Sequence, residues 1–242
     1  MRDPYYERDL ALVHHLGFGF HADLCAPGIL RLLEPVLERR GLVLELGCGS
    51  GLLTRYLVDA GHRVVATDAS PAMLELARGY VPGAEDIQQL TLPDDRLPDA
   101  AAIVSIGHAI SYLDSTEEIE RALIRIAGAI PTGGLFAVDI CDLEWGVVRR
   151  EQPNFSDGGK DWAIITRFSQ PARNKYVRDM TTFLRNDDGS WRRSDECHEN
   201  VLVDTSQIPA LLADHGIDAT VESSFGAEKL PSGLKIVIGR KR

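Results

Sequence analysis

Residues 42–52 read LVLELGCGSGL, and the rest of the chain is interpreted around this stretch. The apolar run from Leu42 to Leu46 is typical of a buried parallel strand. Three glycines at alternate positions interrupt it, and helical spacing of leucines resumes after them. Glycine lets the backbone turn tightly and lets a ligand approach without meeting a Cβ atom. The following helix offers free N–H groups to an anion. Strand, loop and helix together predict a Rossmann-like nucleotide site.

Two classes of cofactor compete for such a loop. The dinucleotide pattern G-x-G-x-x-G needs a glycine at position 52, where this chain has Leu52. The observed E-L-G-C-G-S-G segment resembles motif I of the class I S-adenosylmethionine (SAM) dependent methyltransferases, and the resemblance extends over roughly Leu42 to Ile140. It implies that SAM is the cofactor and S-adenosyl-L-homocysteine the product. It also implies that the methionine end of SAM is held by Glu45, Gly47, Cys48, Gly49 and Gly51.

Composition restricts the fold and the partners. A chain of 242 residues with 44% hydrophobic content predicts one α/β domain with an elaboration. The net charge of −10, with no basic run before Arg240, argues against a broad nucleic-acid surface. The four cysteines lack paired spacing, so we expect no metal site and a reducing compartment. The N-terminus MRDPYYERD is polar and no apolar run reaches about 18 residues. These features predict a cytoplasmic protein without a membrane partner, and they leave its oligomeric state open.

The N-terminal segment, residues 1–27, is rich in aromatic residues and histidines, among them His21. The resemblance suggests a lid over the cofactor, and a surface arm is an equally open interpretation. Residues 28–40 then have one broad apolar face, which predicts an amphipathic helix on the sheet.

A second acid follows the next predicted strand. Residues 63–67 predict a second buried strand, which ends at Asp68. A carboxylate accepts two hydroxyl donors at once, and the resemblance implies that Asp68 binds the two ribose hydroxyls of SAM. It further implies that Ala69 and Met73 flank the adenine, although Met73 is also compatible with an ordinary core position.

The residue that binds the adenine amino group is less clear. The family has a short strand here that ends in an acid, and Asp86 with Ile87 lies at the usual distance before Leu92. We therefore expect these two residues at the adenine. Counted from Pro82-Gly83, the position falls instead on Leu90-Thr91, where Leu90 carries no acid.

Polar residues follow two further predicted strands, residues 100–106 and 135–140. The first strand leads into His108 and Tyr112, and Asp139 ends the second. Open α/β sheets bind ligands at this edge. His108 is therefore a candidate general base beside the methyl group, or a histidine that only bonds a backbone carbonyl. Tyr112 and Asp139, like His21, are candidate substrate residues.

The pattern changes to period two between residues 141 and 204. Segments 162–168, 176–184 and 191–203 predict three antiparallel strands. The insertion resembles the substrate-covering sheet of small-molecule N-methyltransferases. Glu196 and His198 share one face of its last strand, which predicts either a polar substrate pocket or a solvated outer face.

The remaining residues, 205–242, predict a helix and two final strands. The resemblance implies a seven-stranded, mostly parallel sheet whose last strand is antiparallel, with residues 28–140 and 205–242 as the core and 141–204 as the insertion. The predicted function is SAM-dependent methyl transfer to an N or O nucleophile of a small molecule. A nicotinamide-dependent oxidoreductase is disfavoured by Leu52 and by the antiparallel ending, and a non-catalytic SAM-binding protein shares every cofactor residue.

Overall fold

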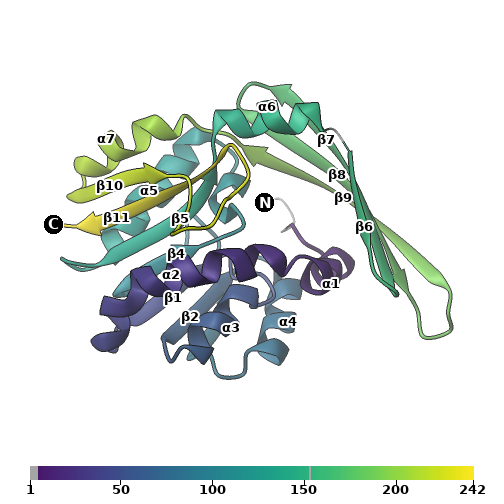
Figure 1. Ribbon diagram of the computed structural model, residues 1–242, viewed down its shortest axis with the longest axis horizontal. Coiled ribbons are helices and arrows are strands. Elements are labelled where there is room, and N and C mark those ends of the chain that lie inside the picture. Colours follow the sequence, from purple (N-terminus) through teal and green to yellow (C-terminus); the bar gives the residue numbers. More distant parts are fainter. Residues whose placement is uncertain (1–4, 153) are drawn as a thin grey trace.

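A seven-stranded mixed sheet occupies the centre of the fold (Figure 1). The computed structural model describes residues 5–152 and 154–242. The strand order is β10-β11-β5-β4-β1-β2-β3. Only β11 runs antiparallel to its neighbours in this sheet, and the other pairs are parallel. This arrangement confirms the predicted fold class. The strands are β1 (Leu42–Leu46), β2 (Arg63–Asp68), β3 (Asp86–Gln89), β4 (Ala102–Ser105), β5 (Leu135–Cys141), β10 (Ile217–Glu222) and β11 (Leu234–Lys241).

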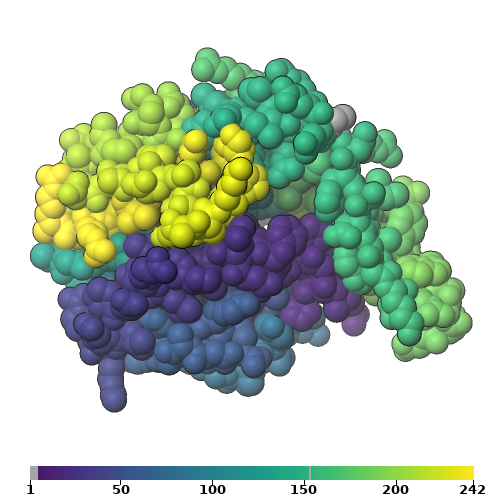
Figure 2. Space-filling model, in the orientation of Figure 1, coloured from purple at the N-terminus to yellow at the C-terminus, as the bar shows by residue number. Residues whose placement is uncertain are grey.

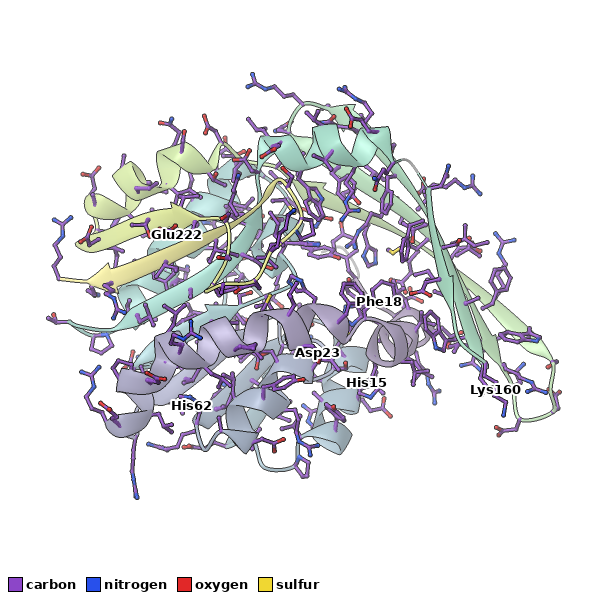
Figure 3. The ribbon with its side chains drawn as sticks, in the orientation of Figure 1. His15, Phe18, Asp23, His62, Lys160 and Glu222 are labelled. Atoms are coloured by element: carbon purple, nitrogen blue, oxygen red, sulfur yellow. The ribbon has the colours of Figure 1, made fainter. Side chains whose placement is uncertain are left out.

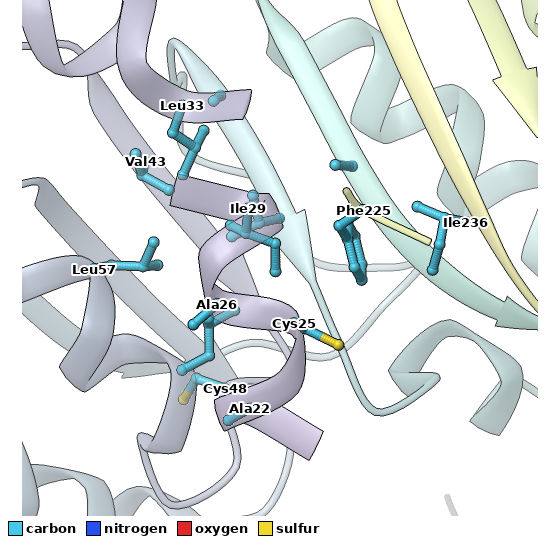
Figure 4. Close-up of a cluster of buried hydrophobic side chains, with 14 of the residues drawn as sticks. Ala22, Cys25, Ala26, Ile29, Leu33, Val43, Cys48, Leu57, Phe225 and Ile236 are labelled. Carbon is cyan, nitrogen blue, oxygen red and sulfur yellow. The ribbon is translucent and has the colours of Figure 1, made fainter. Parts of the chain in front are cut away.

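Helices cover both faces of this sheet. Consecutive residues of β1, Val43 and Leu44, belong to opposite hydrophobic clusters, because side chains of a strand alternate between its faces. Figure 4 shows the first cluster, in which Ile29 and Leu33 of α2 pack on the sheet. The helices are α1 (Arg8–Gly17), α2 (Phe20–Glu38), α3 (Leu52–Asp59), α4 (Pro71–Tyr80), α5 (Thr116–Ala129), α6 (Leu143–Glu151) and α7 (Ile208–Ala213), with 3-10 turns η1 (Ala109–Tyr112) and η2 (Thr205–Gln207).

The insertion forms a second, antiparallel sheet. Its order is β6 (Asn154–Gly158), β7 (Trp162–Ala172), β8 (Lys175–Arg185) and β9 (Trp191–Val201). Three of these strands were predicted. Strand β6 was missed because all five of its residues are exposed and no apolar alternation marks it. The division of the chain into arm, core and insertion stays a prediction.

The N-terminal segment is largely helical, which the sequence pattern did not predict. Helix α2 begins at Phe20 and contains Pro27, so the expected start near residue 28 was wrong. Leu10 and Val13 of α1 are buried against residues of the second sheet, a contact that the local pattern does not show. In Figure 1 the purple helix α1 lies between α4 of the core and the second sheet, and Figure 2 shows the purple N-terminal segment beside that sheet. Residues 1–4 of the predicted arm lie outside the described residues.

None of the helices in the described ranges combines the length and apolar character that a bilayer crossing requires.

Candidate active site

A cavity of about 470 Å³ lies at the carboxyl ends of the parallel strands. Its walls come from the loops that follow β1, β2, β3 and β4 and from the N-terminal segment, as expected for an open α/β sheet. Phe18, labelled in Figure 3 where α1 meets α2, lies in its wall. The predicted site residues that line it are His21, Glu45, Gly47, Cys48, Gly49, Asp68, Ala69, Met73 and Tyr112.

The glycine loop needs glycine for steric reasons. Gly47 has a φ of 65° and Gly51 a φ of 87°, in the left-handed region that other residues seldom adopt. A Cβ atom on Gly47 would lie 2.3 Å from the Cβ of Ala109, and one on Gly51 would lie 2.8 Å from Cγ2 of Val81. Gly51 does not line the cavity, so it shapes the start of α3 and its predicted contact with a cofactor is not seen.

Asp68 is fixed at the end of β2 by two backbone groups. Its Oδ2 accepts the N–H of Gly49 at 2.8 Å, and its Oδ1 accepts the N–H of Ser70 at 2.8 Å. Burial raises the pKa of this carboxyl group, and the two N–H donors act in the opposite direction. Each oxygen keeps further acceptor capacity, so the side chain is able to receive two hydroxyl groups from a ligand in the cavity.

Glu45 is a buried carboxyl group with an unused oxygen. It lines the cavity with 1% of its surface exposed, and its Oε2 has no hydrogen-bond partner within the described residues. Burial raises its pKa to about 8. Buried polar atoms are nearly always bonded, so an unused acceptor beside a cavity indicates a ligand that brings a donor.

The expectation for Asp86 and Ile87 does not agree with the structure. Asp86 pairs with Val65 at the start of β3, three residues or about 10 Å from the edge marked by Asp68. Its Oδ1 accepts the N–H of Ile87, and neither residue lines the cavity. Residues 89–94 line it instead, which agrees with the alternative count. The strand is short and partly exposed, so its apolar pattern could not show where it ends.

The Leu90-Thr91 alternative is also changed by the structure. Both residues line the cavity. The N–H of Thr91 already donates to Oδ2 of Asp95 at 2.7 Å, however, and the N–H of Leu90 donates to the backbone of Asp68. A ligand at this end therefore meets side chains of residues 89–94 rather than the N–H of Thr91.

Asp139 holds the loop that contains His108. Its carboxylate accepts the N–H groups of Gly107 and His108 at 2.8 and 2.7 Å and lies 3.2 Å from Nε2 of His21. Asp139 is fully buried and does not line the cavity. It therefore supports the loop after β4 and the side chain of His21 in α2, rather than contacting a ligand directly.

His108 itself lies behind the cavity wall. Its Nδ1 is buried and unpaired among the described residues, and its ring stacks on Tyr112 with centroids 5.7 Å apart. Burial, with the nearby Arg178 and other cations, holds its pKa well below the usual range. The neighbouring residues Gly107 and Ala109 line the cavity.

Glu196 and His198 connect the second sheet to the N-terminal segment. Oε2 of Glu196 lies 2.9 Å from Nε2 of His198, and the same carboxylate accepts the N–H groups of Tyr6 and Glu7. His198 Nδ1 lies 3.4 Å from the hydroxyl of Tyr112. The two residues face inward and support the cavity residues Tyr6 and Tyr112, so the solvated-face interpretation is wrong for them.

Part of the sequence matches known methyltransferases. Residues 44–138 match the family model described as a methyltransferase domain. Residues 44–138 thus form a methyltransferase domain, within the fold of the class I SAM-dependent methyltransferases. The chain is 22% identical to the putative methyltransferase YqeM of Bacillus subtilis over 76% of both chains.

Solved methyltransferase structures share this fold. A SAM-dependent methyltransferase from Clostridium acetobutylicum superposes with a TM-score of 0.78 at 15% identity, covering 96% of this chain and 97% of the other. The sugar N-methyltransferase KedS8 from Streptoalloteichus gives 0.75 at 17% identity, covering 100% and 96%. Both likenesses establish the fold. With the family match, they decide against the nicotinamide-dependent alternative, whereas measured turnover separates an enzyme from a non-catalytic SAM-binding protein.

The residues of this methyltransferase fit SAM. The α-ammonium group of its methionine part is the donor that the unused Oε2 of Glu45 requires. The ribose hydroxyls match the free acceptor capacity of Asp68. We therefore expect the methionine end at the glycine loop and the adenine toward residues 89–94.

SAM affinity is expected to rise as the pH is raised toward about 8. In the free methyltransferase Glu45 has a pKa of about 8 and is mostly neutral at pH 7. The ammonium group binds the charged form, so binding at neutral pH must release a proton, and this requirement disappears above the pKa. Calorimetric titration with SAM in buffers of different ionisation enthalpy measures the number of protons that are released on binding. Glu45→Gln should abolish the release, and an unchanged release in this variant would contradict the assignment.

Several residues at or near the cavity were not predicted individually. Tyr5, Tyr6 and His14 line the cavity, although only His21 of the N-terminal segment was predicted as a site residue. Arg178, which does not line the cavity, shares the inward face of β8 with Tyr176, and the period-two alternation of that strand is the signal that could have located it.

Proposed function

We propose that this methyltransferase transfers the methyl group of SAM to a nitrogen atom of a small molecule. The observation that carries the proposal is that the N-terminal segment and the second sheet meet at the cavity, where Tyr5 and Tyr6 line it and the ring of Tyr6 packs on His198 of β9. A cavity walled in this way suits a small acceptor better than a nucleic-acid duplex or a protein surface. The likeness in fold to the sugar N-methyltransferase KedS8 supports the same choice.

Positioning accounts for much of the catalysis. SAM, when bound, supplies a methyl group on a positively charged sulfonium. Asp139 fixes the loop at Gly107, and Tyr112 with the Glu196–His198 pair fixes the opposite wall. Such walls align an acceptor with the methyl group and exclude water, and alignment of this kind lowers a barrier without a charged catalyst.

A nitrogen acceptor agrees with the properties of His108. An alcohol must lose its proton during transfer, and it needs a good base nearby. The pKa of His108 is held well below its usual range by burial and by the cations around it, so its ring accepts a proton poorly. A neutral amine carries its own lone pair and needs no such base.

His108→Gln tests the nature of the nucleophile. With an amine acceptor found by a mass screen, we expect kcat to fall by less than about tenfold, because the ring only supports Tyr112 and the loop. The pH dependence of kcat/KM should follow the pKa of the acceptor amine in both proteins. A loss of ~10²–10⁴ in kcat, with the pH profile altered, would identify His108 as a general base and contradict the proposal.

A further inference from the structure

Two half-buried arginines lie near the site without an acidic partner. Arg178 in β8 has its guanidinium 5.5 Å from the ring of Tyr112 and donates to that hydroxyl. Arg149 in α6 lies 4.3 Å from the ring of Trp145 and 5.6 Å from that of Phe168. Among the described residues neither arginine forms an ion pair, and the Nε of each is buried without a hydrogen-bond partner.

Each guanidinium group lies over an aromatic ring that is near His108. The ring of His108 lies 5.7 Å from that of Tyr112, over which Arg178 lies, and 5.9 Å from that of Trp145, over which Arg149 lies. Two positively charged groups are therefore present in the surroundings of the residue that follows β4.

Further polar groups that have no partner in the described part of the chain lie near Arg149, Arg178 and His108, and together these residues are called the arginine cluster. Nε1 of Trp145 and the side-chain amide of Asn200 are buried, and they have no partner within residues 5–152 and 154–242. Asn200 lies on the inward face of β9, opposite Tyr176, and the ring of Tyr176 lies 6.3 Å from that of Trp145. Within these ranges both the amide nitrogen and the amide oxygen of Asn200 are unpaired, as is Nε1 of Trp145. Buried polar atoms of this kind are normally bonded, so the arginine cluster has unused hydrogen-bonding groups, two of them donors.

The nearby carboxylates do not supply an acceptor for these donors. Asp139 is used by the loop after β4 and by His21. Glu196 is used by His198 and by the N–H groups of residues 6 and 7. The sulfonium of SAM adds positive charge to the same region. Uncompensated charge is costly when it is partly buried, so a ligand with negative charge is favoured here.

We propose that the methyl acceptor carries an anionic oxygen group, a carboxylate or a phosphate, which the guanidinium groups of Arg149 and Arg178 bind beside His108. The inference rests on the proposed function and specifies its substrate class. Guanidinium groups bind both kinds of anion through paired hydrogen bonds, and Trp145 and Asn200 provide additional donors. The same positive charge favours the neutral form of a bound amine, because it disfavours a second cation beside it.

Anion titration of the protein saturated with S-adenosylhomocysteine tests the inference. The indole N–H resonance of Trp145, one of three tryptophans, is assigned with Trp145→Phe. Sodium acetate or sodium phosphate is added at constant ionic strength. We expect the indole N–H resonance of Trp145 to show a saturable shift with at least one anion. A shift with acetate indicates that the acceptor carries a carboxylate, and a shift with phosphate indicates that it carries a phosphate ester. The absence of a saturable shift with either anion overturns the inference.

Matched variants establish which arginines are responsible. The double variant Arg149→Gln/Arg178→Gln should weaken the anion at least tenfold, while Arg149→Lys/Arg178→Lys should recover part of the affinity through its charge. Arg150→Gln/Arg193→Gln, at exposed positions of α6 and β9, should bind as the wild type does. If Arg149→Gln/Arg178→Gln binds the anion as tightly as the wild type, the inference is also overturned. If that variant fails to fold, the titration of the wild-type protein alone decides whether the anion site exists. Calorimetry of S-adenosylhomocysteine separates the two claims, because failure to bind it contradicts the methyltransferase function itself.

Discussion

Replacing Asp68 by alanine is expected to weaken SAM binding by ~10²–10⁴-fold. The variant loses two hydrogen bonds between ribose hydroxyls and a charged carboxylate, each contributing ~1.5–3 kcal/mol, and each ~1.4 kcal/mol corresponds to a tenfold change in affinity. It also releases the N–H groups of Gly49 and Ser70 that the side chain holds at 2.8 Å. Calorimetric titration with SAM measures the loss.

Asp86→Ala is the matched control for this experiment. Asp86 is an exposed acid on the adjacent strand, it pairs with Val65, and it does not line the cavity. Its removal should leave SAM affinity unchanged. A large loss in Asp86→Ala with none in Asp68→Ala would show that the cofactor is held by the residues first expected at the adenine and not by the end of β2.

Asp139→Ala is expected to lower turnover by at least ~10²-fold, because a displacement of about 1 Å near the reacting atoms has an effect of this size. Asp139 is fully buried and holds the loop at Gly107 and His108. Two N–H groups lose their acceptor, so the free energy of unfolding should fall by ~2–6 kcal/mol. Thermal unfolding and steady-state kinetics measure the two effects.

The division between kcat and KM separates positioning from general destabilisation. If Asp139 positions the loop, kcat should fall more than the KM for SAM rises, at a temperature where the variant is folded. Asp157→Ala, an exposed acid on β6, serves as the control and should retain normal kinetics. Full turnover in Asp139→Ala would contradict the role assigned to this residue.

The cofactor end of the site could be predicted because its signals are local. The apolar strand, the glycines at 47, 49 and 51 and the helix after them are contiguous in the chain, and the structure has β1, the loop and α3 in those places. Asp68 ends a strand whose four central residues are buried. In each of these elements the hydrophobic pattern of the sequence continues up to the functional residue, so it marks where the element ends.

The adenine end could not be located in the same way. Strand β3 has four residues, none of them buried, and the buried residue is Leu90 just beyond it. Without an alternation or an apolar run there was no signal for its end. The expectation for Asp86 therefore placed the acid at the wrong end of the strand, because the register of β3 depends on its pairing with β2.

The proposed acceptor end depends on contacts between distant segments. Arg149 and Arg178 come from a helix and a strand of the insertion, and each lies over a ring, Trp145 or Tyr112, that is near His108. Tyr6 reaches the cavity because Glu196 accepts its N–H. No spacing in the sequence encodes these contacts, since they arise when the second sheet packs over the core.

Transfer of labelled methyl from SAM to a pool of small metabolites tests the central claim most directly. Mass spectrometry follows products heavier by one methyl group, together with S-adenosylhomocysteine. We predict a small-molecule product that forms in equal amount with S-adenosylhomocysteine and is lost with Asp68→Ala. Label found only on macromolecules, or SAM that binds but never yields S-adenosylhomocysteine with any metabolite fraction, would contradict the account.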